Sequence, residues 1–61
     1  MKPLGLFEIT TTREELNDFG IPLGYETGGI VLVHSQNYNS YFFDNNFEIH
    51  KSLLKLKHKI S

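Results

Sequence analysis

The chain has 61 residues, of which 39% are hydrophobic and 21% charged, and its formal net charge is −1. A chain of this length forms one small domain, residues 1–61, with a thin core. It contains no cysteine, which excludes a disulfide framework, a thiol nucleophile and the zinc sites built from cysteine. Its longest apolar run is Ile30–Val33, far short of the roughly 20 residues that a membrane span needs. We therefore expect a cytoplasmic protein that does not enter a membrane.

The charges are unevenly distributed along the chain. Residues 1–48 hold all seven acidic residues and only two basic ones, which leaves five negative charges, whereas residues 49–61 hold four lysines and no acid. Such asymmetry can mark a contact with nucleic acid or a membrane. Four lysines within nine residues also fit the solvent-exposed face of a final strand or helix, which is the interpretation that we favour.

The first half of the chain predicts a strand followed by a long loop. Residues 6–10 are short, apolar-rich and partly β-branched, as in a strand. Thr12 and Glu15 have the spacing of a capping box, and Gly20 stands where a glycine often ends a helix. A segment of about two turns is not stable alone, so we expect a helical turn over residues 12–19 inside the loop.

The second half predicts hairpins. Residues 30–34 are the clearest strand, because they are rich in β-branched residues and are apolar on both faces. Residues 35–37 have turn chemistry, and a three-residue turn would lead into a return strand over residues 38–43. Asp and Asn at positions 44–46 predict a second turn, since both residues tolerate the left-handed conformation.

Alternation along the return strand divides its side chains between two faces. If Tyr38 and Phe42 point inward, then Tyr41 and Phe43 point outward. The buried residues that we expect on this basis are Val31, Val33, Phe42 and Leu56.

The last fifteen residues fit two structures. Residues 54–60 alternate strictly between apolar and polar, as in a strand. The spacing of Ile49, Leu53, Leu56 and Ile60 also fits one face of a helix. A helix over residues 47–60 would give an α+β fold with antiparallel hairpins and a C-terminal helix.

Four short motifs resemble the small SH3-like β-barrels: Ile21-Pro22-x-Gly24, Gly28-Gly29-Ile30-Val31-x-Val33, Tyr38-x-x-x-Phe42-x-Asp44 and Ser52-Leu53-x-Lys55-Leu56. The chain is similar to the short uncharacterised bacterial barrels of this type and, more distantly, to KOW modules. The resemblance covers residues 6–58 and implies a mainly β, five-stranded barrel with a long first loop that contains a helical turn. It also implies a fourth strand at 47–50, a 3₁₀ turn at 52–54 and a fifth strand at 55–59. Small barrels have many unrelated functions.

The residues that most often carry chemistry are scattered. His34, His50 and His58 are 16 and 8 residues apart, which matches no metal-ligand spacing. The close pair Glu14 and Glu15 is explained by the preference for acids in the first turn of a helix. Phosphate-binding and nucleophile-elbow motifs are lacking. We therefore expect no catalytic residue, no metal site and no cofactor, and hence no enzyme.

The aromatic residues of the second half suggest a surface for a partner. An outward pair of Tyr41 and Phe43 would form an exposed apolar patch, which often marks an interaction site, and Tyr25 and Glu26 would extend it. The alternative is that the long loop covers this face and buries both rings in a second small core. We expect a non-enzymatic protein-binding module: an accessory subunit, or the neutralising, antitoxin- or immunity-like partner of a basic protein. A homo-oligomer is compatible with this function.

A second functional hypothesis is a KOW-like module associated with RNA or the ribosome. Lys55, Lys57 and Lys59 would contact phosphates beside the stacking rings of Tyr41 and Phe43. The negative charge of residues 1–48 opposes such an approach, so protein binding is the first hypothesis.

Overall fold

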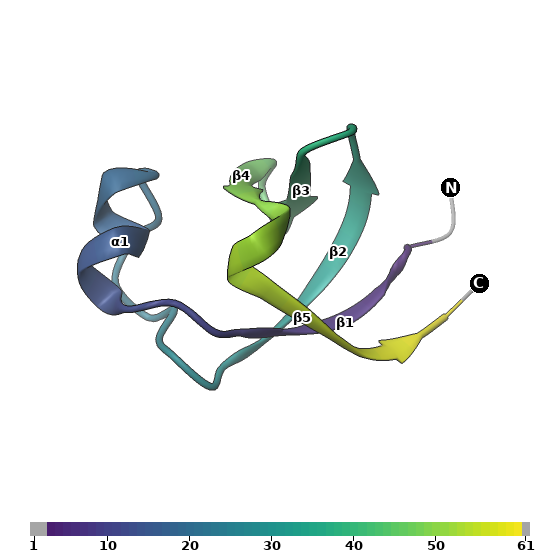
Figure 1. Cartoon of the computed structure of the whole chain (residues 1–61), viewed down its shortest axis with the longest axis horizontal. Coiled ribbons are helices and arrows are strands. Elements are labelled where there is room, and N and C mark those ends of the chain that lie inside the picture. Colours follow the sequence, from purple (N-terminus) through teal and green to yellow (C-terminus); the bar gives the residue numbers. More distant parts are fainter. Residues whose placement is uncertain (1–2, 61) are drawn as a thin grey trace.

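The computed structural model describes residues 3–60 and contains one sheet of five antiparallel strands in the order β4-β3-β2-β1-β5. In chain order its elements are β1 (Gly5–Ile9), α1 (Arg13–Asp18), β2 (Ile30–Gln36), β3 (Ser40–Phe43), β4 (Phe47–His50), the 3₁₀ helix η1 (Lys51–Leu53) and β5 (Leu54–Lys59). Figure 1 shows the sheet strands curving around one another, with α1 at one end of the molecule. The expected mainly β fold is confirmed.

Neither helix within the described residues is long and apolar enough to cross a membrane.

The C-terminal segment is a strand, so the alternative of a helix over residues 47–60 is wrong. Strand β5 pairs with β1 and places Leu54 opposite Ile9 and Leu56 opposite Phe7. This pairing occupies the edge of β1, which would otherwise present unpaired backbone groups. The short helix η1 lies directly before β5, as expected, and the His50 Nδ1 atom accepts a hydrogen bond from the Ser52 N–H at 3.2 Å.

Strands β1 and β5 approach closely at Gly5. A Cβ atom on this residue would lie 2.4 Å from the carbonyl oxygen of His58, so only glycine fits without moving the strands. The register of the pair shifts between Leu6, which faces His58, and Phe7, which faces Leu56. Lys57 is therefore the extra residue of a β-bulge on β5.

The first hairpin turns two residues later than predicted. Strand β2 continues to Gln36, and the turn consists of residues 37–39. The Asn37 side-chain oxygen accepts hydrogen bonds from the N–H groups of Asn39 and Ser40, at 3.1 and 2.7 Å. This turn places Tyr38 outside the strand with 91% of its surface exposed.

The later turn also changes which side chains of β3 face the core. Phe43 is fully buried and pairs with Val33, which is also fully buried. The alternation of β3 is intact but has the opposite phase to the predicted one: Tyr41 and Phe43 pair with Ile49 and Phe47 and pack on the core, whereas the bulge between Val33 and Ser35 lies on β2. The predicted inward position of Phe42 is wrong: it is only partly buried and lies outside the core cluster.

The core lies on one side of the sheet and under the long loop. Its buried members are Phe7, Ile9, Leu16, Ile21, Val31, Val33, Phe43, Ile49 and Leu54. Burial of Val31 and Val33 is confirmed. Burial of Leu56 is wrong, since 48% of its surface is exposed; it lies beyond the part of β5 where Leu54 meets the core.

The loop between β1 and β2 is closed at its base by backbone hydrogen bonds. The Ile9 N–H donates to the Gly29 carbonyl at 2.9 Å, and the Gly28 N–H donates to the Ile9 carbonyl at 2.8 Å. Between these points the chain forms α1 and returns. The loop ends therefore meet beside the sheet, while its helix extends to one end of the molecule (Figure 1).

The predicted helical turn forms with caps at both ends. The Thr12 hydroxyl accepts from the Glu15 N–H at 3.2 Å, but the Glu15 carboxylate accepts from the Thr11 hydroxyl, so half of the capping box is present. After α1, Gly20 has a φ of +75° and the Ile21 N–H donates to the Leu16 carbonyl at 3.0 Å. This is a Schellman motif, in which buried Leu16 and Ile21 supply the accompanying apolar contact.

The turn predicted over residues 44–46 is confirmed. Asp44 and Asn46 have φ angles of +49° and +67°. Both side chains tolerate this left-handed region, so the hairpin between β3 and β4 is encoded locally.

Candidate functional site

Tyr41 and Phe43, the aromatic pair predicted to point outward, both pack on the core. Phe43 is fully buried, with its ring centroid 5.5 Å from that of Tyr25 and 5.8 Å from that of Phe47. The prediction that it points outward is wrong. For Phe43 the structure agrees with the alternative that the long loop covers this face, since the loop residue Tyr25 packs on the ring, whereas Tyr41 is only partly buried.

Tyr41 is half-buried and belongs to a different surface. Its ring centroid lies 4.5 Å from that of Phe7. The ammonium group of Lys51 lies 5.2 Å from the Tyr41 ring centroid, a cation–π distance. Tyr41 therefore packs at the edge of the core with part of its ring accessible.

Tyr25 has a structural contact that the sequence did not predict. Its hydroxyl donates to a carboxylate oxygen of Asp44, on the turn between β3 and β4. This hydrogen bond, followed by burial and the negative charge of Asp44, raises the pKa of Tyr25 above its usual value. The neighbouring Glu26 is exposed, with its carbonyl oxygen bound to the Gly29 N–H at 2.9 Å.

Arg13 organises the inside of the long loop. Its guanidinium donates to the carbonyl oxygens of Ile21, Pro22 and Tyr25, and to the side-chain oxygen of Asn17 at 2.7 Å. The planar group with several donors suits such a convergent set of acceptors. Arg13 thereby ties residues 21–25 to α1, so that the helix and the returning segment form one unit.

This unit exposes two apolar side chains on a loop that also carries exposed carboxylates. Leu23 is 84% exposed and Phe19 42% exposed. The exposed acids of the same loop are Glu14, Glu15, Asp18 and Glu26, and Arg13 is the one basic residue of the loop. We call Phe19, Leu23, Glu14, Asp18 and Glu26 the acidic loop surface.

The three lysines of the RNA hypothesis do not form one patch. Lys57 pairs with Glu8 at 3.2 Å, and Lys55 stands opposite Glu8 in the sheet. The bulge at Lys57 places Lys59 on the other face, opposite Gly5, where it lines a hollow together with Tyr41. The bulge therefore separates charges that strict alternation would have aligned.

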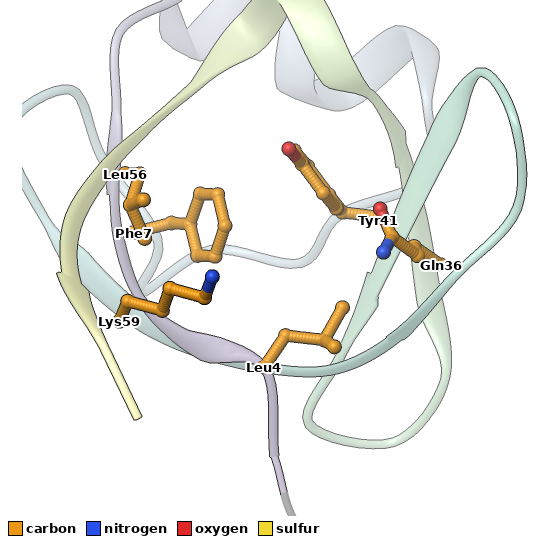
Figure 2. Close-up of a pocket in the computed structure, with 6 residues that line it drawn as sticks. All are labelled: Leu4, Phe7, Gln36, Tyr41, Leu56 and Lys59. Atoms are coloured by element: carbon orange, nitrogen blue, oxygen red, sulfur yellow. The ribbon is translucent and has the colours of Figure 1, made fainter. Parts of the chain in front are cut away.

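The hollow has a volume of about 190 Å³ and is lined by residues of β1, β2, β3 and β5 and by Leu4, which precedes β1. Its lining residues are Leu4, Phe7, Gln36, Tyr41, Leu56 and Lys59. Figure 2 shows Phe7, Leu56 and Lys59 on one side and Tyr41 and Gln36 across from them, with Leu4 between the two groups. Its walls combine apolar surface with one amide, one phenol and one ammonium group.

Within residues 3–60 no three histidine or acidic side chains gather closely enough to hold a metal ion. His50 instead caps η1 through its Nδ1 atom.

No protein-family model matches the chain, and searches among curated proteins and among solved structures give no match.

Sequence reasoning found Glu26, Tyr41 and Lys59 as surface residues but missed the exposed positions of Phe19 and Leu23. Phe19 follows Leu16 at a spacing of three, which by itself would predict one shared apolar face. The signal was the helix end itself: Phe19 is the C-cap, with a non-helical φ of −91° and ψ of 2°, so its side chain leaves that face.

Proposed function

We propose that the chain is a non-enzymatic protein-binding module that recognises a basic cytoplasmic protein. The observation that carries this proposal is the acidic loop surface, in which the exposed Phe19 and Leu23 lie on a loop fixed by Arg13. The proposed surface does not include Phe43, because this residue is fully buried.

Three physical arguments support this surface. A loop that is already ordered loses less conformational entropy on binding than a flexible one, and Arg13 orders this loop. Binding energy is concentrated in a few side chains that become buried at the interface, and aromatic residues are frequent among them. Carboxylates around such anchors attract a positively charged partner and accelerate association. Phe19 and Leu23 are thus the anchors, and Glu14, Asp18 and Glu26 select the charge of the partner.

We propose an SH3-like barrel as the finer description of the fold. The support is the order of elements: a first strand, a long loop, three strands joined by tight turns, a 3₁₀ turn and a last strand that returns to pair with the first. The curvature of the sheet around a single core in Figure 1 is compatible with that description.

RNA binding is the weaker proposal. Lys57 forms an ion pair with Glu8, and Lys59 lies on the opposite face of the sheet from Lys55. A phosphate backbone would therefore meet one free lysine of β5 at a time, which gives little of the cumulative charge that nucleic-acid affinity requires.

The test is capture from a native lysate with the immobilised chain and with the double variant Phe19→Ser/Leu23→Ser. We expect the wild-type chain to retain one predominant basic protein and the double variant to lose it. Circular dichroism should show both chains folded, since both side chains are exposed.

The matched control is Tyr38→Ser, which removes an aromatic ring that is 91% exposed but lies on the turn between β2 and β3. This variant should capture the partner like the wild type. Equal capture by the double variant, or a captured protein with an acidic charge, would contradict the proposal. Capture that disappears on nuclease treatment would favour RNA.

A further inference from the structure

We propose that the hollow at Phe7, Tyr41 and Lys59 binds the C-terminal residue of another polypeptide, with an apolar side chain inside and the terminal carboxylate at Lys59. This site is separate from the acidic loop surface. It lies between the beginning of β1 and the end of β5, whereas α1 lies at the opposite end of the molecule (Figure 1).

The walls of the hollow favour an apolar group. Leu4 and Leu56 border it, and the rings of Phe7 and Tyr41, with centroids 4.5 Å apart, form its inner wall. Leu56 is 48% exposed although it stands on the core side of β5, opposite Phe7. An occupant would remove this apolar surface from water, and the free energy gained scales with the area that is covered.

The charges at the mouth favour an anion. Figure 2 shows the Lys59 side chain on the same side of the hollow as Phe7, with its ammonium nitrogen next to the Phe7 ring. Among the described residues the ion pair is Glu8–Lys57, so the Lys59 ammonium faces no carboxylate of residues 3–60 within 4 Å. Lys51 does not line the hollow, but its ammonium group lies 5.2 Å from the centroid of the Tyr41 ring, which does. A carboxylate would be the complementary group.

The size and shape of the hollow favour the end of a chain. A volume of about 190 Å³ is below the roughly 300–1,000 Å³ of sites that enclose a whole small ligand. It is sufficient for one side chain of leucine size. The Gln36 amide and the Tyr41 hydroxyl, which also line the hollow, can bond the peptide group before that residue. These features select a C-terminal apolar residue over a free amphiphile.

The test is a titration of the isotope-labelled chain, followed by amide NMR signals, with the peptide acetyl-Gly-Gly-Leu and with its C-terminal amide. We expect saturable shifts at Phe7, Tyr41 and Leu56 with a dissociation constant on the order of 1 mM for the acid. The amide, and acetyl-Gly-Gly-Gly with a free carboxylate, should each bind at least about tenfold more weakly.

Two variants identify the groups responsible. Lys59→Gln should weaken binding of the acid about tenfold and leave binding of the amide unchanged, whereas Leu56→Ser should weaken both. Lys57→Gln is the matched control, because this lysine pairs with Glu8 on the other face, and it should bind the acid like the wild type. Phe19→Ser/Leu23→Ser should also bind normally, which separates this site from the proposed function.

Three results would overturn the proposal. The first is equal affinity for the acid and the amide. The second is 4-methylpentanoate binding as tightly as the peptide, which would indicate a site for free acids. The third is the lack of a saturable shift at Phe7, Tyr41 and Leu56 with 20-fold more peptide than the expected dissociation constant.

Discussion

The hydroxyl of Tyr25 donates a hydrogen bond to the carboxylate of Asp44, and this contact fastens the long loop to a turn nineteen residues further along the chain. The Tyr25 ring also covers Phe43 and Phe47, with centroid distances of 5.5 and 5.8 Å. One side chain thus joins the loop, the β3–β4 turn and the core.

Tyr25→Phe should lower the free energy of unfolding at pH 7 by about 0.5–1.5 kcal/mol, because it removes the hydrogen bond and keeps the ring. The raised pKa of Tyr25 means that the folded state holds the phenol proton more tightly than the unfolded state. The contribution is therefore complete below pH ~10 and is lost as the pH rises above that value. Urea unfolding at pH 7, 9 and 11 measures this.

Tyr38→Phe is the control for that prediction, because this hydroxyl belongs to a ring that is almost entirely exposed. It should leave the free energy of unfolding unchanged at pH 7. We expect the difference in the free energy of unfolding between the wild type and Tyr25→Phe to shrink between pH 9 and 11. A difference that grows over this range would contradict the role of Asp44 as hydrogen-bond acceptor.

Phe43→Ala should unfold most of the protein at 25 °C. Deleting a fully buried phenylalanine costs about 3–5 kcal/mol, and a domain of this size holds roughly 3–5 kcal/mol in total. Phe42→Ala, at the adjacent and only partly buried position, should cost less than half as much. Far-UV circular dichroism with urea titration compares the two, and equal losses would show that the assignment of faces on β3 is incorrect.

Arg13→Gln should loosen the long loop while the sheet stays folded. The substitution removes the donors that bind the carbonyl oxygens of Ile21, Pro22 and Tyr25, and hydrogen bonds to a charged group contribute about 1.5–3 kcal/mol each. Limited proteolysis should then cut within residues 19–25, and hydrogen exchange there should accelerate. Glu14→Gln changes an exposed side chain of the same helix and should do neither. Unchanged protection of the loop in Arg13→Gln would argue against the anchoring role.

Gly5→Ala should destabilise the domain by about 1–3 kcal/mol, because the new methyl group would force β1 away from the His58 carbonyl. Gly20→Asn is the comparison: this position has a φ of +75° and open space around it, and asparagine tolerates such a backbone. Gly20→Asn should lower the free energy of unfolding by only a few tenths of the loss expected for Gly5→Ala. Thermal unfolding distinguishes them, and a fully stable Gly5→Ala would show that the strands separate easily.

The elements that sequence reasoning placed correctly are those fixed by local chemistry. Thr12, Gly20 and the residues at positions 44–46 each specify a backbone conformation by themselves, and the helix caps and the turn follow from them. The strand at the C-terminus was decided by pairing with β1, a contact that no local pattern reveals.

The side-chain faces of β3 were predicted poorly because the phase of the alternation was taken from Tyr38, which lies in the turn and not in the strand. The Asn37-stabilised turn lets β3 begin at Ser40, with Tyr41 and Phe43 on the core side. The error was largest for the candidate site. Phe43, predicted at the surface, lies in the core, and Leu56, predicted in the core, lines a hollow together with Lys59. A bulge depends on how one strand pairs with its neighbour, so the bulges were not visible in the sequence.

The backbone bonds between Ile9 and residues 28–29 have a consequence for how this protein can diversify. They close the loop at its base, so changes at its tip, around Leu23, need not be transmitted to the strands. Lengthening a flexible loop costs only about 0.6 kcal/mol for each doubling of its length. Descendants of this chain can therefore acquire new tip sequences, and new binding preferences, at little cost to stability, provided that Leu16 and Ile21 continue to fill the core.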